Sequence, residues 1–510
     1  MSHWLFLPLD GRPCNARFPV ELAALAGQQV LCPPVEALGD ALRPARRDRL
    51  ESWIESRLPG AQGLFLSLDT WLYGNLVASR KNQEGLKALQ LRLEQLRALK
   101  ARHPDLTIHG FATLLRLSNS NDDTEERPYW KQYGTQIYRL SWLEHYLKSR
   151  VDNELQAEYE ALCESIPADL LLDYRQLRSR NLALLEAVLA LQNDGILDTL
   201  LIGCDDGGSY GWTIQERQSL EESIAVQGLA TRSLIYPGAD ELACVLLARV
   251  LITERPRIQV KWTWPEARQL ITRYEGIPLN ETLRYQAQAV GVELLDDLEI
   301  DDVTDASPAC DGLLWVHNFP AGEQIDQFLD RESRQTVSTE HFTPLFSALT
   351  QSIPLALADV CYANGGDIQL LETLESEGLL LSLSAYAAWN TSGNTLGMLL
   401  AWFKLFLTGV NSHLQLRFLI ERLADDGWYQ GKLRQELCAN YTDPVTLNSC
   451  IQAIAQLNDK LRAWREQLSD PPSCLQIQHL SFPWKRFFEV DLRVCTQSVA
   501  EEGLANQGSA

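Results

Sequence analysis

The sequence predicts an α/β protein built on mainly parallel sheets. Short apolar runs alternate with longer helical patterns over most of the 510 residues, and this alternation is typical of strands joined by helical crossovers. Hydrophobic residues make up 45 % of the chain, which is enough to bury a large core. We expect an N-terminal lobe that is either barrel-like (TIM-type) or doubly wound, a second α/β lobe, and helices at the C-terminal end.

Ten apolar runs have the length and flanking residues of buried strands. They are Trp4–Leu9, Gln29–Cys32, Gly63–Leu68, Leu106–Thr113, Thr199–Gly203, Ser233–Tyr236, Ile258–Trp262, Gly312–His317, Pro354–Ala358 and Leu379–Leu383. Between them, Gly85–Arg102 shows the helical pattern most clearly. Leucines at 86, 89, 93, 96 and 99 fall on one face, which predicts a helix packed on a sheet.

The pattern of apolar and polar residues along the chain changes after Glu254-Arg255-Pro256 and again near residue 400. We therefore expect an N-terminal α/β lobe over residues 1–250 and a second α/β lobe over 251–400. The remaining residues, 401–510, have a mostly helical pattern.

Composition excludes several classes of partner. The formal net charge is −22, which argues against nucleic acid and anionic membrane surfaces, because both attract basic patches. There is no run of about 18 apolar residues to span a membrane, and the opening MSHWLFLPLDGRP has the pattern of a first strand rather than a signal peptide. The 11 cysteines show no CxxC pair or zinc spacing, which predicts reduced thiols and a cytoplasmic location. The oligomeric state stays open.

Polar side chains follow seven of the predicted strands. Ligands of parallel α/β sheets bind outside the carboxyl ends of the strands. A single Asp or Asn at such a place is ordinary turn or cap chemistry, but recurrence at seven strand ends indicates a ligand site. The candidate binding residues are Asp10, Arg12, Asn15, Asp69, Tyr73, Arg80, Arg116, Asn119, Tyr210, Asp240, Glu241, Asp359, Asn364, Asp367, Tyr386, Trp389, Asn390 and Asn394.

The stretch LLIGCDDGGSYGWT places two adjacent acids, Asp205 and Asp206, at the end of an apolar run. A turn requires one Asp before glycine, whereas two neighbouring negative charges cost stability unless something offsets them. Proteins tolerate such a cost mainly at functional sites. We therefore predict that Asp205 and Asp206 are catalytic. The adjacent Cys204 is a poor nucleophile candidate, because nearby negative charge raises the pKa of a thiol.

The mixture of residue types favours a polyhydroxylated ligand, a small molecule or an oligosaccharide. Carboxylates and amides hydrogen-bond to hydroxyl groups, and aromatic faces cover the apolar side of a sugar ring. Dinucleotide and phosphate-loop motifs are absent, as are HExxH and GxSxG. We expect no cofactor and assign no metal ligand.

Seven motifs together resemble a bacterial family catalogued as a domain of unknown function. They are PLDGRPCN, SLDTWLYGNLVASR, CDDGGSYG, YPGADELACVLLAR, DVCYANGGD, AAWNTSGNTLG and FPWKRFFEV. The resemblance spans about residues 4 to 492 and implies no particular activity, cofactor or catalytic residue.

A second, local similarity concerns the acid pair. An Asp-Asp pair directly after a barrel strand is similar to the catalytic pair of the O-GlcNAcase-type β-N-acetylhexosaminidases. In that mechanism one Asp orients the substrate acetamide, which is the nucleophile, and the other is the general acid/base. The similarity implies these two roles for Asp205 and Asp206.

Three functional hypotheses follow. The leading one is a carbohydrate-active enzyme, a glycoside hydrolase that uses paired carboxylates, with substrate assistance on N-acetylhexosaminides as one form. The first alternative is a metal-dependent hydrolase or lyase, since Asp and Asn oxygens suit Mg²⁺ or Ca²⁺. The second is a sugar-binding or sensing protein without catalysis. The sugar, the linkage and the anomeric outcome stay open.

Overall fold

The computed structural model describes residues 2–205, 207–295, 310–334, 336–409, 411–442, 446–469 and 471–496. The chain divides into two compact units. The first comprises residues up to Val20, Gln28–Leu247 and Tyr274–Ile277. The second comprises Glu21–Gly27, Ala248–Arg273 and the chain from Pro278 onward.

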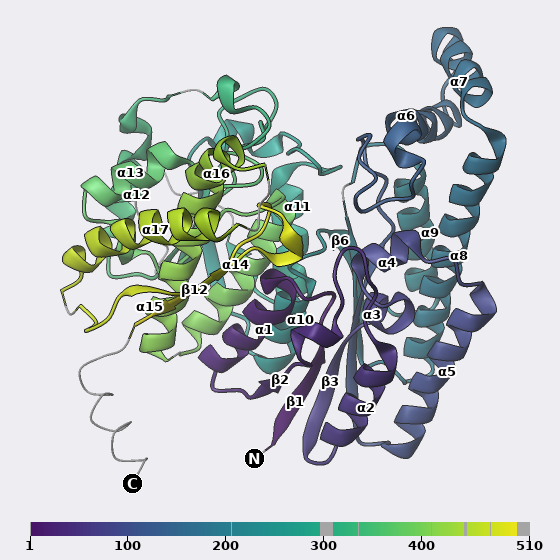
Figure 1. The fold of residues 1–510 in the computed structure, drawn as a ribbon, viewed down its shortest axis with the longest axis horizontal. Helices are drawn as coiled ribbons and strands as arrows, with labels where there is room; N and C mark the ends of the chain where they lie inside the picture. Colours follow the sequence, from purple (N-terminus) through teal and green to yellow (C-terminus); the bar gives the residue numbers. More distant parts are fainter. Residues whose placement is uncertain are drawn as a thin grey trace. The chain divides into compact units, whose positions relative to one another are not determined.

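The first unit is built on six parallel strands (Figure 1). In chain order its elements are β1 (His3–Leu7), α1 (Pro13–Leu25), β2 (Val30–Leu31), α2 (Arg47–Arg57), β3 (Ala61–Ser67), α3 (Leu68–Tyr73), α4 (Leu76–Lys81), α5 (Leu86–Arg102), β4 (Thr107–Leu114), α6 (Trp130–Leu147), α7 (Asn153–Ser165), α8 (Ala168–Asn193), β5 (Thr199–Cys204), α9 (Trp212–Val226), β6 (Ser233–Pro237) and α10 (Leu242–Leu251), with α1 and α10 continuing into the second unit.

The strand order of this sheet is β2-β1-β3-β4-β5-β6, and every pair is parallel. The order reverses at β1, as in a doubly wound fold, so the carboxyl ends of β1 and β3 form a topological switch point. Among the described residues, no strand pair joins β2 to β6 to close a barrel. The strand pairing therefore matches the doubly wound form of the expected fold.

One face of the six-stranded sheet packs against helices α2, α5, α8 and α9 (Figure 1). On α5 the buried residues are Leu89, Leu93, Leu96 and Leu99, which confirms the helix predicted from the leucine spacing. They join one apolar cluster with alternate strand residues, among them Leu5, Leu64, Ile108 and Leu200. Residues of one strand face share this core because successive side chains on a strand point to opposite faces.

The second unit contains a five-stranded parallel sheet of order β11-β10-β9-β7-β8. Its elements are β7 (Arg257–Trp262), α11 (Leu279–Val290), β8 (Glu293–Leu295), β9 (Gly312–His317), α12 (Thr343–Leu349), β10 (Leu355–Asp359), α13 (Ile368–Ser376), β11 (Ala385–Ala387), α14 (Ser392–Leu407), α15 (Ser412–Arg422), the π-helix η6 (Leu423–Leu433), α16 (Arg434–Asn440), α17 (Leu447–Gln467), β12 (Gln476–Ser481) and β13 (Asp491–Cys495). The order reverses between β7 and β9. Strands β9 and β10 are buried throughout, as expected for a parallel sheet covered on both faces.

The structure differs from the predicted elements in two places. The prediction of a strand at Leu379–Leu383 was wrong, because Leu380–Ser382 forms a 3₁₀ turn and the strand is Ala385–Ala387. The leucines of this run include Leu380 and Leu383, which are buried, so apolar content alone does not separate a buried turn from a strand. The C-terminal region also contains strands, because β12 and β13 pair as an antiparallel hairpin.

No helix in the part of the chain that the structure describes has both the length and the apolar character needed to cross a membrane.

Packing of α5 makes a direct prediction about stability. Leu96 is fully buried, whereas Leu91 on the same helix is 68 % exposed. We expect Leu96→Ala to lower the free energy of unfolding by about 2 to 5 kcal/mol, because the cavity left in the core cannot fully close. Leu91→Ala is the matched control and should change stability by no more than about 0.5 kcal/mol. Urea denaturation followed by circular dichroism measures both, and equal effects would contradict this packing.

Candidate functional site

The carboxyl edge of the six-stranded sheet carries most of the residues predicted from the first half of the sequence. Parallel strands bring their carboxyl ends to one edge, so residues far apart in the chain become neighbours. Three sets of contacts organise this edge, centred on Arg12, Asp69 and Arg80.

Arg12 ties the end of β1 to the loop after β6. Its Nη2 lies 2.8 Å from Asp10 Oδ2 and 2.6 Å from Asp240 Oδ1, and Asn15 Nδ2 donates to the same Asp240 oxygen at 3.0 Å. All four side chains are buried. Because β1 and β6 are not paired in the sheet, this ion pair joins their ends. The geometry gives these residues a structural role, and contact with a substrate stays a prediction for them.

Asp69 lies in the first turn of the short helix α3 after β3 and is buried. Its carboxylate accepts hydrogen bonds from the Thr113 backbone N–H at 2.8 Å and from the Thr113 hydroxyl at 3.0 Å. The next residue, Thr70, places its hydroxyl 2.6 Å from the Pro8 carbonyl, which fixes α3 against the end of β1. Burial raises the pKa of Asp69 to about 7, although the Thr113 hydrogen bonds and the nearby Arg80 charge oppose the shift.

Arg80 lies at the centre of the third set of contacts. Its Nη1 is 2.7 Å from Glu125 Oε2 and its Nη2 is 2.5 Å from Asp205 Oδ2. The Arg80 side chain is only 2 % exposed, whereas both carboxylate side chains are 16 % exposed. One buried guanidinium therefore holds two acids from different loops, and both acids keep a face toward solvent.

The pairing of Asp205 with Glu125 was not predicted. Glu125 lies in NDDTEERP, a run of acids after β4, and from this loop we predicted only Arg116 and Asn119. The acidic run after β4 could have indicated a carboxylate at this strand end. Asp206, the predicted partner of Asp205, lies outside the described residues, so its role stays a prediction.

The other predicted residues of the first unit differ in their contacts and in their exposure to solvent. Arg116 Nε donates to Glu126 Oε1 at 2.7 Å, and its Nη2 lies 3.3 Å from Glu125 Oε2. Asn119 is exposed, and Tyr73 and Glu241 are buried. Burial raises the pKa of Tyr73.

Tyr210 belongs to a group of partly exposed aromatic rings. Its ring meets Trp142, His145 and Tyr146 of α6 edge-on, with ring centroids 5.4, 5.4 and 5.2 Å away. Trp142 and Tyr146 stack on each other. Tyr210, five residues after Asp205, therefore anchors the loop that carries Asp205 on α6.

In the second unit, predicted residues gather where β9, β10 and β11 end. Asp359, the last residue of β10, is fully buried. Its Oδ2 accepts from the Asp367 backbone N–H at 2.7 Å and from the Tyr386 hydroxyl at 3.2 Å. Burial raises the pKa of Asp359 to about 6, and the neighbouring His317 opposes that shift.

The motif YANGGD forms a tight loop over Asp359. A side chain at Gly366 would overlap the Tyr386 hydroxyl and come within 3.0 Å of Asp359 Oδ2, so this position requires glycine. Asn364 donates from Nδ2 to Asp326 Oδ2 at 2.6 Å. Asp367 ends the loop and caps α13, since its side chain accepts from the Gln369 N–H. The capping role is the structural alternative for Asp367, and it accounts for one of its two oxygens.

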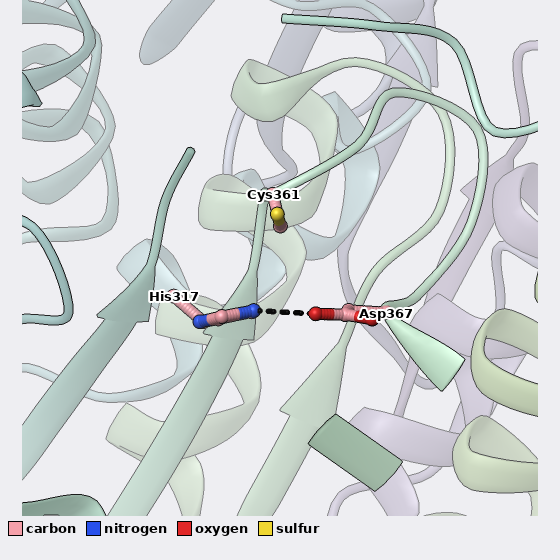
Figure 2. A group of neighbouring side chains, drawn as sticks. All are labelled: His317, Cys361 and Asp367. Atoms are coloured by element: carbon pink, nitrogen blue, oxygen red, sulfur yellow. Dashed lines mark hydrogen bonds and ion pairs between the residues drawn. The ribbon is translucent and has the colours of Figure 1, made fainter. Parts of the chain in front are cut away.

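His317 and Cys361 complete this group, and neither residue was predicted from the sequence. His317 Nε2 lies 3.1 Å from Asp367 Oδ2 (Figure 2). One ligand atom each from His317, Cys361 and Asp367 lie within 4.8 Å of one another, and all three residues are buried. These are side chains of metal-binding type. Histidine spacing along the chain could not reveal them, because they come from the end of β9, the loop after β10 and the start of α13.

The π-helix η6 borders the same loop. Asp426 Oδ1 accepts from Arg422 Nη1 at 2.7 Å, and its Oδ2 accepts from the Ala388 N–H at 3.2 Å. Its backbone carbonyl accepts from Gly366 N–H at 3.0 Å. Segments of π-helix occur often at functional sites, and this one positions the loop that carries Asp367.

Three predicted residues lie in or beside the loop after β11. The Trp389 ring is 5.8 Å from that of Phe488. Asn390 has a φ of 67°, and its carbonyl accepts from the Asn364 N–H at 3.0 Å. Asn394 lies in the first turn of α14, where its N–H donates to the Thr391 side chain. These contacts connect the motifs YANGGD and WNTSGN.

The pKa of Asp69 predicts a pH dependence of stability. The folded-state pKa of about 7 lies above the ordinary 3.8, so the folded protein binds more protons than the unfolded chain between these values. The free energy of unfolding should therefore fall as pH rises from about 4 to about 7.

Asp69→Asn removes this titration and keeps partners for Thr113. Relative to wild type, the variant should gain on the order of 1 to 3 kcal/mol between pH 5 and pH 8. Denaturant unfolding across this range measures the gain, with the exposed Asp105→Asn as control. A difference from wild type that does not change with pH would refute the raised pKa.

The comparison with known proteins agrees with the motifs. A family model described as "Protein of unknown function (DUF4127)" matches residues 4–493. No curated protein matches the chain. Since the match covers nearly the whole sequence, the resemblance found from the seven motifs is confirmed, and the chain belongs to the family described as Protein of unknown function (DUF4127).

Proposed function

We propose that the protein is a carbohydrate-active enzyme, a glycoside hydrolase, with its reaction centre at the carboxyl edge of the six-stranded sheet. The observation that carries the proposal is the pair Asp205 and Glu125, held by the buried Arg80 and partly open to solvent. Arg12 also holds two acids, Asp10 and Asp240, but those side chains are 0 % and 7 % exposed. Of these two pairs, the Arg80 pair is the more exposed and therefore the better placed to meet a substrate.

The contacts with Arg80 set an upper limit on the separation of the two carboxylates, and this limit is compatible with glycoside hydrolysis. Oxygens bound to the two terminal nitrogens of one guanidinium lie no more than about 7.5 Å apart, given contacts of 2.7 and 2.5 Å. Glycosidases place their two carboxyl groups about 5 to 9.5 Å apart, and one donates a proton while the other acts as base or nucleophile. The limit allows either the retaining or the inverting geometry.

The surroundings support a sugar as the substrate. Arg116, which contacts Glu125, is 18 % exposed, and the exposed Asn119 follows in the same loop. Tyr210 and the stacked rings of Trp142 and Tyr146 add partly exposed aromatic faces. Polar groups that hydrogen-bond to hydroxyls, combined with aromatic faces, are typical of carbohydrate sites.

Substitution of the two acids tests the proposal. We expect Asp205→Asn and Glu125→Gln each to reduce kcat by about 10²- to 10⁴-fold, the usual effect of losing a general acid, base or nucleophile. The assay is a panel of aryl glycosides that includes N-acetylhexosaminides, and Asp206→Asn belongs in the same series. The exposed Asp169→Asn, on α8, is the control and should keep wild-type activity.

Other outcomes select the alternatives. If both variants hydrolyse the substrate at the wild-type rate, the Arg80 pair is structural and the proposal is wrong. If, in addition, chelation abolishes the activity of these variants and of wild type, the protein is a metal-dependent hydrolase instead. If wild type cleaves no glycoside but binds a sugar in calorimetry, the protein is a sugar-binding or sensing protein.

A further inference from the structure

We propose that His317, Cys361 and Asp367 form a binding site for a transition-metal ion of the zinc class within the second unit. The inference is independent of the glycoside hydrolase proposal, since it concerns other residues and a different sheet. It also departs from the expectation from sequence, which assigned no metal ligand.

The donor set is the first argument. Imidazole nitrogen, thiolate sulfur and carboxylate oxygen are the three protein ligands that zinc uses. Magnesium and calcium prefer oxygen alone, so a site with sulfur and nitrogen disfavours them. Three protein ligands also leave a fourth position, as in catalytic zinc sites, which keep one position for water or substrate.

The distances are close to those that an ion requires. The three ligand atoms lie within 4.8 Å of one another, and His317 Nε2 lies 3.1 Å from Asp367 Oδ2. Tetrahedral zinc with bonds of about 2.0 to 2.3 Å needs ligand separations of roughly 3.3 to 3.7 Å. The Cys361 sulfur would therefore move inward by about 1 Å or less.

Asp359 supplies an independent observation. Among the described residues, its Oδ1 has no hydrogen-bond partner, although the residue is 0 % exposed. A buried carboxylate oxygen without a donor is costly and calls for an explanation such as a bound ion. The other oxygen, Oδ2, accepts from the Asp367 backbone N–H at 2.7 Å, so this acid lies beside one of the proposed ligands.

The local charge also favours a cation. Asp359 and Asp367 are two acids beside one histidine, and Arg334 is a nearby cation whose charge interacts with Asp367. Arg334 donates its hydrogen bonds elsewhere, to the backbone carbonyls of Gln327 and Gly431. A divalent ion would balance the two acids within the cluster.

His317 is held in the orientation that a metal ligand needs. Its Nδ1 lies 3.1 Å from the Thr263 hydroxyl, which also accepts from Trp315 Nε1 at 3.0 Å. When Nε2 binds an ion, Nδ1 carries the proton and donates it to the second lone pair of Thr263. Such outer contacts fix the tautomer and orientation of histidine ligands.

Binding changes the proton count. Burial raises the pKa of the Cys361 thiol, so the free protein holds S–H. The ion displaces this proton, which leaves to solvent, and a sulfur–metal bond forms. His317 binds the ion through Nε2 as the neutral tautomer with its proton on Nδ1, and a proton held on Nε2 in the free protein moves to Nδ1 or leaves to solvent. No electrons are transferred.

Cobalt(II) substitution tests the site in the full-length protein. Metal-stripped wild type should bind one Co²⁺ per chain and show a near-ultraviolet thiolate-to-cobalt charge-transfer band, and added Zn²⁺ should remove that band. Cys361→Ser should abolish it. Cys204→Ser, at a buried free cysteine of the first unit, is the matched control and should keep it.

Thr263→Val provides a second variant that retains every ligand. It removes the hydroxyl that orients His317 and should weaken Co²⁺ binding by about 10- to 100-fold. A wild-type protein without the band and without stoichiometric zinc in elemental analysis overturns the proposal. So does a band that survives in Cys361→Ser, which would indicate the exposed thiols Cys163 and Cys438. Neither result depends on glycoside hydrolysis, so the two proposals fail separately.

Discussion

A buried guanidinium that bridges two carboxylates is the interaction on which the first unit depends. Arg12 bridges Asp10 and Asp240, and Arg80 bridges Glu125 and Asp205. Taking such charges out of water costs several kcal/mol per ion, and only paired geometry offsets the cost. The arginines therefore allow acids to sit at the ends of apolar strands. The bidentate fork of arginine suits this task, because it can bind acids from two loops at once.

The two bridges serve different purposes because their exposure differs. The Arg12 bridge is closed to solvent, and it joins the end of β1 to the loop after β6 without a strand pair. The Arg80 bridge leaves both acids partly exposed. Asp69 is also buried, and its carboxylate is hydrogen-bonded to Thr113. Burial raises its pKa to about 7, although the Thr113 hydrogen bonds oppose the shift. Differences among neighbouring acids of this kind are how proteins prepare proton donors and acceptors.

The buried acids of the second unit have different neighbours. Asp359 and Asp367 are neighbours of a histidine and a cysteine, and the glycines of YANGGD let the loop lie directly on Asp359. The π-helix η6 supports that loop through Asp426, whose own charge is balanced by Arg422. A cluster of mixed nitrogen, sulfur and oxygen donors is suited to a metal ion. The two sheets therefore present different chemistry at equivalent edges.

The sequence by itself determined the α/β class, nine of ten strands to within a few residues, and the strand ends that carry polar side chains, because alternation and burial leave a periodic record along the chain. It could not determine which strand ends become neighbours. Strand order put Asp205 beside Arg80 and Glu125, and these three residues are more than 40 residues apart in the chain. It also put His317 beside Cys361 and Asp367, which lie more than 40 residues further along the chain. Apolar content also misplaced the strand at Leu379–Leu383, since a buried 3₁₀ turn needs the same leucines. Only the tertiary structure decided these points, because hydrogen-bonded strand pairing and long-range ion pairs depend on distance in space rather than on position in the chain.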